Sequence, residues 1–224
     1  IIELSHSMDL SITFRAGGTS LSGQAISDSI LVITSRNFSN FRIASDASSI
    51  SLQPALTGAQ VNGLLAKYSK KIGPDPASIN AAMIGGIAAN NASGMCCGIS
   101  QNSYKTLKSI KLIFADGTKL DTGCEESKNA FKKSHGDFLK DLKSFSDDTK
   151  NNEELRAKIE KKFKIKNTCG YSLNALIDFE DEFEILEHLI IGSEGTLAFI
   201  EEITYYTVED LKDKASSLIY FKDI

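Results

Sequence analysis

Short runs in which apolar and polar residues alternate recur along the chain, and such alternation is typical of half-buried strands. In the first quarter these runs predict four strands, at 11–14, 30–34, 41–43 and 50–53. A stronger alternation over 107–114 leads into the turn sequence Ala-Asp-Gly-Thr and predicts a β-hairpin that returns over 119–122. A last alternation predicts a strand over 196–207.

Helical spacing of apolar residues occurs between these strands. Thr57 is a suitable N-cap for a helix over 58–68, whose apolar face would carry Val61, Leu64, Leu65 and Tyr68. Residues 125–165 are rich in charge and show helical spacing, so we interpret their charged runs as solvated helix faces. Residues 1–8 resemble the end of a helix whose earlier part is absent. Residues 208–216 predict a polar helix, and 217–221 predict a strand that the end of the chain interrupts.

One stretch, residues 73–94, fits neither pattern because it consists mostly of small residues. Pro74 and Pro76 keep its start extended, and Gly85 and Gly86 lie in its middle. It is too apolar for a solvated linker and buries too little surface for a core element. Small residues let a ligand approach backbone amides closely. We therefore expect a polar, flat or phosphorylated cofactor to lie against what we predict to be a long loop.

Two further glycine-rich turns follow apolar runs. The sequence Arg-Ala-Gly-Gly-Thr-Ser at 15–20 follows the first predicted strand, and Gly-Ser-Glu-Gly-Thr-Leu at 192–197 follows Leu189, Ile190 and Ile191. The first turn has free amides and hydroxyls suited to an anion such as pyrophosphate. Each turn, taken alone, is equally compatible with an ordinary turn.

Together and in this order, the three stretches resemble the FAD-linked oxidase family, of the vanillyl-alcohol oxidase or p-cresol methylhydroxylase (PCMH) type. The matching sequences are RAGGTSLSGQ, then GPDPAS with IGGIAANNASG, then IGSEGTLAFI, and the resemblance extends over 11–207. Within the family, the chain is most similar to the branch of D-lactate dehydrogenases, glycolate oxidase subunits and D-2-hydroxyglutarate dehydrogenases.

The resemblance implies an α+β, PCMH-type FAD-binding fold. Two α/β subdomains would contain a small mixed sheet and a larger, mostly antiparallel sheet flanked by helices. The FAD-binding domain would span 1–207 with an incomplete N-terminal βαβ segment. A truncated substrate-binding cap domain would begin at 208–224.

The resemblance also assigns the FAD-binding residues. The first loop would contact the pyrophosphate, the central stretch the pyrophosphate and isoalloxazine, and the third loop the adenosine or the ring edge. The assigned residues are Arg15, Ala16, Gly17, Gly18, Thr19, Ser20, Pro76, Ala77, Ser78, Ile79, Met83, Ile84, Gly85, Gly86, Asn90, Asn91, Ala92, Ser93, Gly94, Ile191, Gly192, Ser193, Glu194, Gly195, Thr196 and Leu197. In the loop that resembles the family's GYxLN sequence, Tyr171 and Asn174 are candidates for the substrate side, although structural roles fit them equally well.

The implied reaction is oxidation of a D-2-hydroxy acid, such as D-lactate, glycolate or D-2-hydroxyglutarate, by hydride transfer to flavin N5. Covalent attachment in the wider family commonly uses a histidine near the first motif, where this chain has Ala16 to Thr19, so FAD is expected to bind noncovalently.

The catalytic base stays unassigned and no metal site is expected in this piece. Metal ligands and an iron–sulfur region would belong to parts outside it. The electron acceptor is not assigned and could be a quinone, a cytochrome or a flavoprotein. Homodimerisation and peripheral membrane association through other regions also stay open.

Composition narrows the remaining classes. With 224 residues, 42% hydrophobic and 24% charged, and a net charge of −4, the chain can bury a core and gives no reason to expect nucleic-acid binding. It contains no apolar run of membrane-spanning length and no signal peptide pattern. Its four cysteines lack metal-site spacing and indicate reduced thiols in a cytoplasmic compartment.

The sequence lacks the residues that other nucleotide-binding and hydrolase motifs require. No glycine run continues into the Gly-Lys of a P-loop, and neither a Rossmann GxGxxG nor a GxSxG nucleophile elbow is present. Two alternatives stay open on the same scaffold. One is a flavin-free structural or interaction module, and the other is chemistry similar to that of UDP-N-acetylenolpyruvoylglucosamine reductase.

Overall fold

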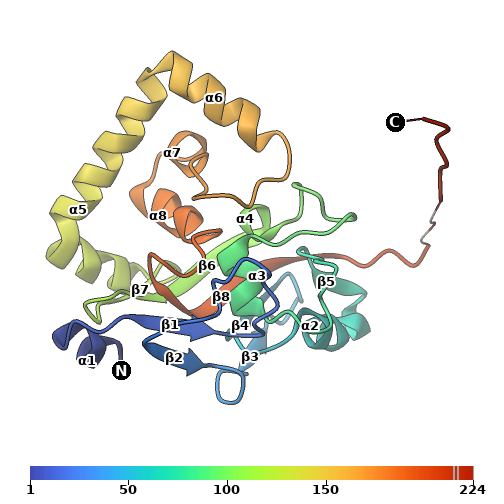
Figure 1. Cartoon of the computed structure of the whole chain (residues 1–224), viewed down its shortest axis with the longest axis horizontal. Coiled ribbons are helices and arrows are strands. Elements are labelled where there is room, and N and C mark those ends of the chain that lie inside the picture. Colours follow the sequence, from blue (N-terminus) through green and yellow to red (C-terminus); the bar gives the residue numbers. More distant parts are fainter. Residues whose placement is uncertain (214, 216, 224) are drawn as a thin grey trace.

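Two sheets of different size form the framework of the computed structural model, which describes residues 1–213, 215 and 217–223 (Figure 1). The smaller sheet pairs β1 (Ile12–Arg15) with β2 (Ile30–Ile33) in parallel. The larger sheet is antiparallel, and its order is β3 (Phe41–Ile43), β4 (Ser49–Leu52), β8 (Phe199–Glu209), β6 (Leu107–Ile113) and β7 (Lys119–Asp121). The predicted fold class is thus confirmed, with the correction that the smaller sheet is parallel and not mixed.

Strand β8 is the centre of the larger sheet. It pairs with β4 on one side and with β6 on the other, and its last residues also pair with β5 (Lys70–Ile72). Its inward side chains Ile203 and Tyr205 are fully buried. The Tyr205 hydroxyl lies 2.9 Å from Ser103 Oγ, so this buried phenol has a partner.

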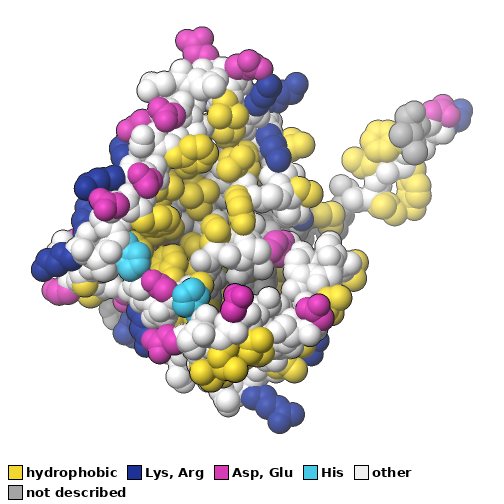
Figure 2. Space-filling model, turned by 60° about the vertical axis from the view of Figure 1, so that its left-hand side comes forward, with side chains coloured by type: hydrophobic (Ala, Val, Ile, Leu, Met, Phe, Trp, Pro, Cys, Tyr) yellow, Lys and Arg dark blue, Asp and Glu magenta, His cyan; other side chains and the backbone are white. Residues whose placement is uncertain are grey.

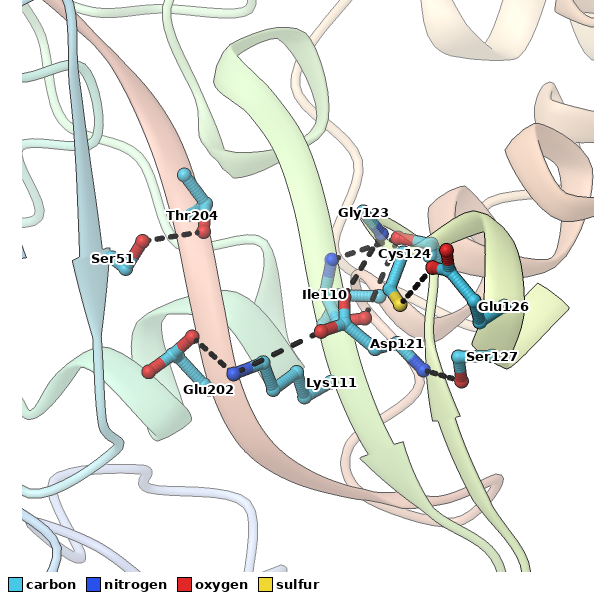
Figure 3. Close-up of polar contacts among 11 residues, drawn as sticks. Ser51, Ile110, Lys111, Asp121, Gly123, Cys124, Glu126, Ser127, Glu202 and Thr204 are labelled. Atoms are coloured by element: carbon cyan, nitrogen blue, oxygen red, sulfur yellow. Dashed lines mark hydrogen bonds and ion pairs between the residues drawn. The ribbon is translucent and has the colours of Figure 1, made fainter. Parts of the chain in front are cut away.

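Polar pairs cross neighbouring strands on the other face of the larger sheet (Figure 3). Ser51 Oγ and Thr204 Oγ1 are 2.9 Å apart, and Lys111 Nζ lies 3.0 Å from Glu202 Oε1. The hydrogen bond to Glu202 raises the pKa of Lys111. Such cross-strand pairs fix the register that places Ile203 and Tyr205 in the core.

Helices cover the core face of this sheet. Helix α2 (Gly58–Leu65) begins at a capping box between Thr57 and Gln60 and continues as a 3-10 turn, Ala66–Tyr68. Most of the buried apolar residues of α2, of α3 (Ile84–Asn90) and of α8 (Glu182–Ile190) form one cluster with those of β4, β6 and β8. The remaining short helices are α1 (Ile2–Ser7), α4 (Ser103–Thr106) and α7 (Ala175–Asp178).

Two helices form an arm beside this body. Helix α5 (Glu125–Asn151) is kinked at His135, where the backbone is not helical. It meets α6 (Glu153–Phe163) at Asn152, whose side chain caps α6 (Figure 1). Figure 2 shows apolar side chains in a hollow on this side of the molecule, with charged side chains around it. This agrees with the prediction that the charged runs are solvated helix faces.

Three predictions from the pattern are wrong. Residues 84–90 form a helix inside the stretch predicted as a loop. Strand β8 extends to Glu209, where a polar helix over 208–216 was predicted, because Val208 pairs with Lys71. Residues 210–213 and 215 are not helical either, and Lys214 and Ser216 lie outside the described residues. Residues 217–221 are not a strand, since no described segment pairs with them.

Candidate functional site

Three segments that are far apart in the sequence meet around one cleft. The loop that leaves β1, the helix α3 and the loop before β8 line two adjoining cavities of about 180 and 320 Å³. Both cavities are lined by Phe14, Ala16, Gln24, Gly86, Ala89 and Glu194. The two cavities therefore adjoin along these residues and are together called the cleft, and their combined size is one that ligand sites commonly have.

The first loop lies directly on the backbone that precedes α3. A Cβ added to Gly17 would lie 2.7 Å from the Ala81 carbonyl oxygen and 3.3 Å from Met83 N. Gly18 has φ of +62°, and the Arg15 side chain packs against it. Only glycine allows this close approach at position 17, which explains the Gly-Gly pair.

The third loop is fastened to the C-terminal end of α3. The amides of Gly192 and Glu194 donate to the carbonyls of Ala88 and Ala89 at 3.1 and 2.8 Å. Asn90 Nδ2 donates to Glu194 Oε1 at 2.5 Å. The bond to Ala89 satisfies a carbonyl that the end of the helix leaves free, whereas the Ala88 carbonyl also accepts a hydrogen bond at the helix C-cap. Glu194 is held at a φ of +56°, a conformation that non-glycine residues adopt mainly where surrounding contacts enforce it.

The middle of α3 presents bare backbone to the cleft. A Cβ added to Gly86 would meet no atom within 4 Å, whereas a Cβ at the neighbouring Gly85 would lie 2.6 Å from the Pro54 side chain. Gly86 is therefore the glycine with open space in front of it, and Gly85 is required for packing.

The walls of the cleft differ in character. The end near the first loop carries the polar groups of Arg15, Thr19, Ser20 and Gln24, where Ser20 Oγ donates to Gln24 Oε1 at 2.6 Å. The other end is apolar and includes Phe14 and Phe199, whose ring centroids are 4.3 Å apart. A molecule that fits this cleft has an anionic or polyhydroxyl part and a flat apolar part.

A carboxylate holds the central stretch in place behind the cleft. Asp75 accepts hydrogen bonds from the backbone amides of Gly94 and Cys97, at 2.9 and 3.2 Å. Burial raises the pKa of Asp75, but the hydrogen bonds from Cys97 and Gly94 outweigh burial and lower it overall. The hydroxyls of Ser93 and Ser193 are buried beside α3 and have no hydrogen-bond partner among the described residues.

The structure brings about half of the predicted site residues together. The following line the cleft: Arg15, Ala16, Gly17, Gly18, Thr19, Ser20, Ser78, Met83, Gly85, Gly86, Asn90, Ala92, Glu194, Gly195 and Thr196. The following lie outside its lining: Pro76, Ala77, Ile79, Ile84, Asn91, Ser93, Gly94, Ile191, Gly192, Ser193 and Leu197. Ile84 and Ile191 are fully buried in the core.

The two substrate-side candidates lie in different places. The Tyr171 hydroxyl is 2.9 Å from Thr196 Oγ1, which connects its loop to the rim of the cleft. Asn174 lines a separate cavity between α4, α6 and α7.

Sequence reasoning missed the apolar wall and several polar groups. Phe14, Pro54, Ala89 and Phe199 line the cleft although they belong to strands, turns or helices with ordinary patterns. Gln24 could have been found, because it ends the first quoted motif.

Within the described residues, no group of histidine, cysteine or acidic side chains could hold a metal ion. Among the helices that the structure describes, none has the length and apolarity needed to cross a bilayer.

Comparisons with known proteins agree with this geometry. The family model described as FAD binding domain matches residues 1–123, more than half of the chain. The chain is 27% identical over 208 residues to D-2-hydroxyglutarate dehydrogenase of Haemophilus influenzae, covering 90% of this chain and 20% of that protein. It is 22% identical over 226 residues to D-lactate dehydrogenase of Archaeoglobus fulgidus, covering 99% of this chain and 38% of that protein.

Solved structures confirm the fold. Glucooligosaccharide oxidase of Acremonium strictum, whose FAD is described as 6-S-cysteinyl and 8α-N1-histidyl, superposes with a TM-score of 0.57 at 13% identity. The match covers 93% of this chain and 32% of the oxidase. The chain therefore spans between a fifth and two-fifths of the length of these relatives.

Proposed function

Because the chain belongs to the family of FAD-binding domains, we propose that the cleft between the first loop, α3 and the third loop holds FAD noncovalently, in a protein that oxidises a D-2-hydroxy acid. The observation that carries the proposal is the convergence of three glycine-rich segments on two adjoining cavities. These segments are separated by about 60 to 100 residues in the sequence, so ordinary turns would have no reason to meet.

The lining fits the parts of FAD. The bare backbone at Gly86 leaves room for a group pressed against α3, and the apolar wall at Phe14 and Phe199 suits a flat ring. The pyrophosphate belongs at the end with Arg15 and the Gly17–Gly18 amides, because the Glu194 carboxylate lies in the part that the two cavities share. Glu194 would instead accept a hydrogen bond from a ribose or ribityl hydroxyl.

The composition of the lining supports the proposal of noncovalent binding. Neither cysteine nor histidine lines the two cavities. The attachment residues named for the Acremonium oxidase therefore have no counterpart in this cleft.

The substrate is proposed from the relatives named D-2-hydroxyglutarate and D-lactate dehydrogenase. Bound FAD supplies a hydride acceptor at its N5. The residues of this chain would bind and orient the cofactor. A base for the hydroxyl proton and cations for the substrate carboxylate are expected in a cap domain beyond β8. Turnover is thus expected of the whole protein, with D-lactate, glycolate and D-2-hydroxyglutarate as test substrates and their L-enantiomers as controls where these exist.

The first test is an absorbance spectrum of the purified chain after FAD is added and the excess removed. Retained flavin bands at near-ultraviolet and blue wavelengths, released on denaturation, would support noncovalent binding. A full-length protein that stays colourless at high FAD concentration would favour the flavin-free alternative.

A substitution in α3 tests the location. Gly86→Leu places a side chain in the open cleft without a clash at Cβ, and should lower FAD affinity at least tenfold. Replacing a helical glycine gains up to about 1 kcal/mol of helix propensity, so the unfolding free energy should not fall. Gly63→Leu is the matched control, since Gly63 lies exposed in α2 with no atom within 4 Å of its added Cβ. Equal FAD affinities in both variants would place the flavin elsewhere.

A further inference from the structure

Two neighbouring loops form an exposed surface at the C-terminal end of α6. One is the loop after α3, residues 91–102, and the other is the loop after α6, residues 164–174. Lys166 Nζ donates to the Ser93 carbonyl at 2.5 Å and so joins the two loops (Figure 1). Both loops also contribute to the lining of one cavity, which shares no residue with the cleft proposed for FAD.

The chain is strongly basic at this end of α6. Residues 156–166 contain six lysines or arginines and one acidic residue, in a chain whose net charge is −4. Four of these cations are engaged by carboxylates or backbone carbonyls. Lys161 and Lys164 are exposed and have no hydrogen-bond or ion-pair partner among the described residues. The surface therefore carries positive charge that the described part of the chain does not neutralise.

Large aliphatic side chains are exposed to water beside these lysines. Ile165 directly follows Lys164 and is 71% exposed, and Ile99 lines the same cavity as both and is 37% exposed. Met95, two residues after Ser93, is fully exposed. Solvation explains exposed lysines, but exposing methionine and isoleucine forgoes the free energy of burying them. Aliphatic side chains among lysines are typical of surfaces that contact the interface of an anionic bilayer.

An acidic protein is the competing partner for such a surface. Protein interfaces are enriched in aromatic residues and arginine and are depleted of lysine, whereas both free cations here are lysines. We propose that Met95, Ile99, Lys161, Lys164 and Ile165 form a surface that binds an anionic lipid bilayer peripherally. The lysines would contact lipid phosphates, and the aliphatic side chains would enter the interface between head groups and acyl chains.

Vesicle sedimentation of the purified chain tests this proposal. The chain should bind vesicles of phosphatidylglycerol and phosphatidylcholine at least tenfold more tightly than vesicles of phosphatidylcholine alone. Salt at about 1 M should weaken this binding strongly, because the screening length falls to about 3 Å. The double variant Lys161→Gln/Lys164→Gln should bind at least tenfold more weakly, since each lysine near an anionic bilayer raises the affinity about fivefold.

A matched control removes the same charge elsewhere. Lys67→Gln/Lys133→Gln changes two exposed lysines of α5 and of the 3-10 turn, outside this surface, and should bind as the wild type does. Equal binding by the two double variants, or no preference for anionic vesicles, would overturn the proposal. Retention on immobilised polyglutamate without vesicle binding would overturn it in favour of an acidic protein.

A tryptophan reporter tests the depth of contact. The chain contains no tryptophan, so Met95→Trp provides a single probe, and Tyr68→Trp provides a control at another exposed position. On anionic vesicles the emission of Met95→Trp should shift to the blue and be quenched by lipids with brominated acyl chains, whereas that of Tyr68→Trp should not change. Bound protein without this quenching would exclude insertion at Met95. None of the five surface residues lines the cleft, so the outcome does not depend on FAD.

Discussion

At the residue scale, the most consequential titratable group lies in α8. Glu187 is 8% exposed, and burial raises its pKa to about 7. A hydrogen bond with Thr122 and the charge of Lys128 favour the charged form of Glu187, whereas the negative charges of Glu184 and Asp181 disfavour it. The ring of the neighbouring His188 stacks on the ring of Phe179, with 4.0 Å between the two centroids. Burial lowers the pKa of His188. Both groups therefore favour their neutral forms in the folded chain.

Glu187 should make the chain less stable as the pH rises. Its folded pKa lies above the usual value of 4.5, so its contribution is fully present below pH 4.5 and is lost as the pH rises through 7. Glu187→Gln should raise the unfolding free energy at pH 8 by on the order of 2 to 3 kcal/mol and have little effect at pH 4.5. Urea unfolding of both proteins across this range measures the difference.

His188 contributes with the opposite sign, since a lowered pKa gives stability that is lost as the pH falls. His188 is present in both proteins, so its contribution to the unfolding free energy largely cancels when the wild type and Glu187→Gln are compared. Parallel pH profiles for the wild type and Glu187→Gln would show that Glu187 does not titrate in this range.

At the scale of elements, the alternating strands and the Thr57 cap were predictable because their signals are local. Strands β3, β6 and β7 lie within one or two residues of their predicted bounds. Helix α3 was missed because two glycines and an asparagine have weak helix propensity. Its helical state depends on tertiary contacts, such as those of Ile84 and Ile87 in the core.

The candidate site was predictable only in part for a related reason. The glycine motifs mark where backbone approaches a partner, but they do not say whether that partner is a ligand or the protein itself. Gly86 faces open space, whereas a Cβ at Gly94 would lie 2.0 Å from the Asp75 carbonyl oxygen. The aromatic wall of Phe14 and Phe199 forms only where two separate sheets pack together, and no local sequence pattern predicts that packing.

The loop after α3 should depend on one carboxylate. Asp75→Ala removes the acceptor for the amides of Gly94 and Cys97 and should lower the unfolding free energy by about 2 kcal/mol. Hydrogen exchange of these two amides should become faster. Asp116→Ala is the control, because Asp116 accepts from Thr118 in an exposed turn and should cost less than about 1 kcal/mol. Equal decreases of the unfolding free energy in both variants would show that Asp75 stabilises the loop no more than a carboxylate in an exposed turn does.

At the scale of the whole molecule, the cleft proposed for FAD lies between the two sheets. The smaller sheet contacts the larger one through Phe14 of β1, whose ring centroid lies 4.3 Å from that of Phe199. Phe38, in the loop between β2 and β3, packs on the same ring at 5.7 Å. A ligand in the cleft would touch β1, α3 and the start of β8 at once. It would therefore act as a bridge between the sheets.

Bound FAD should protect the smaller sheet more than the larger one. At an FAD concentration 100 times the dissociation constant, stabilisation reaches about 2.7 kcal/mol. Hydrogen exchange in β1 (Ile12–Arg15) should slow strongly on binding, while exchange in β7 (Lys119–Asp121) should change little. Uniform slowing of both strands would instead indicate that FAD acts only on global unfolding.

The central place of β8 has a consequence for biosynthesis. Strands β4 and β6 flank it in the sheet, yet β8 follows them in the sequence by about 90 to 150 residues. Until the ribosome has released residues 199–209, the edges that β4 and β6 present to β8 are unpaired, and such edges invite association between chains. A nascent chain stalled before residue 199 should therefore be held by chaperones and digested readily by proteases, and both properties should disappear once residue 209 has emerged.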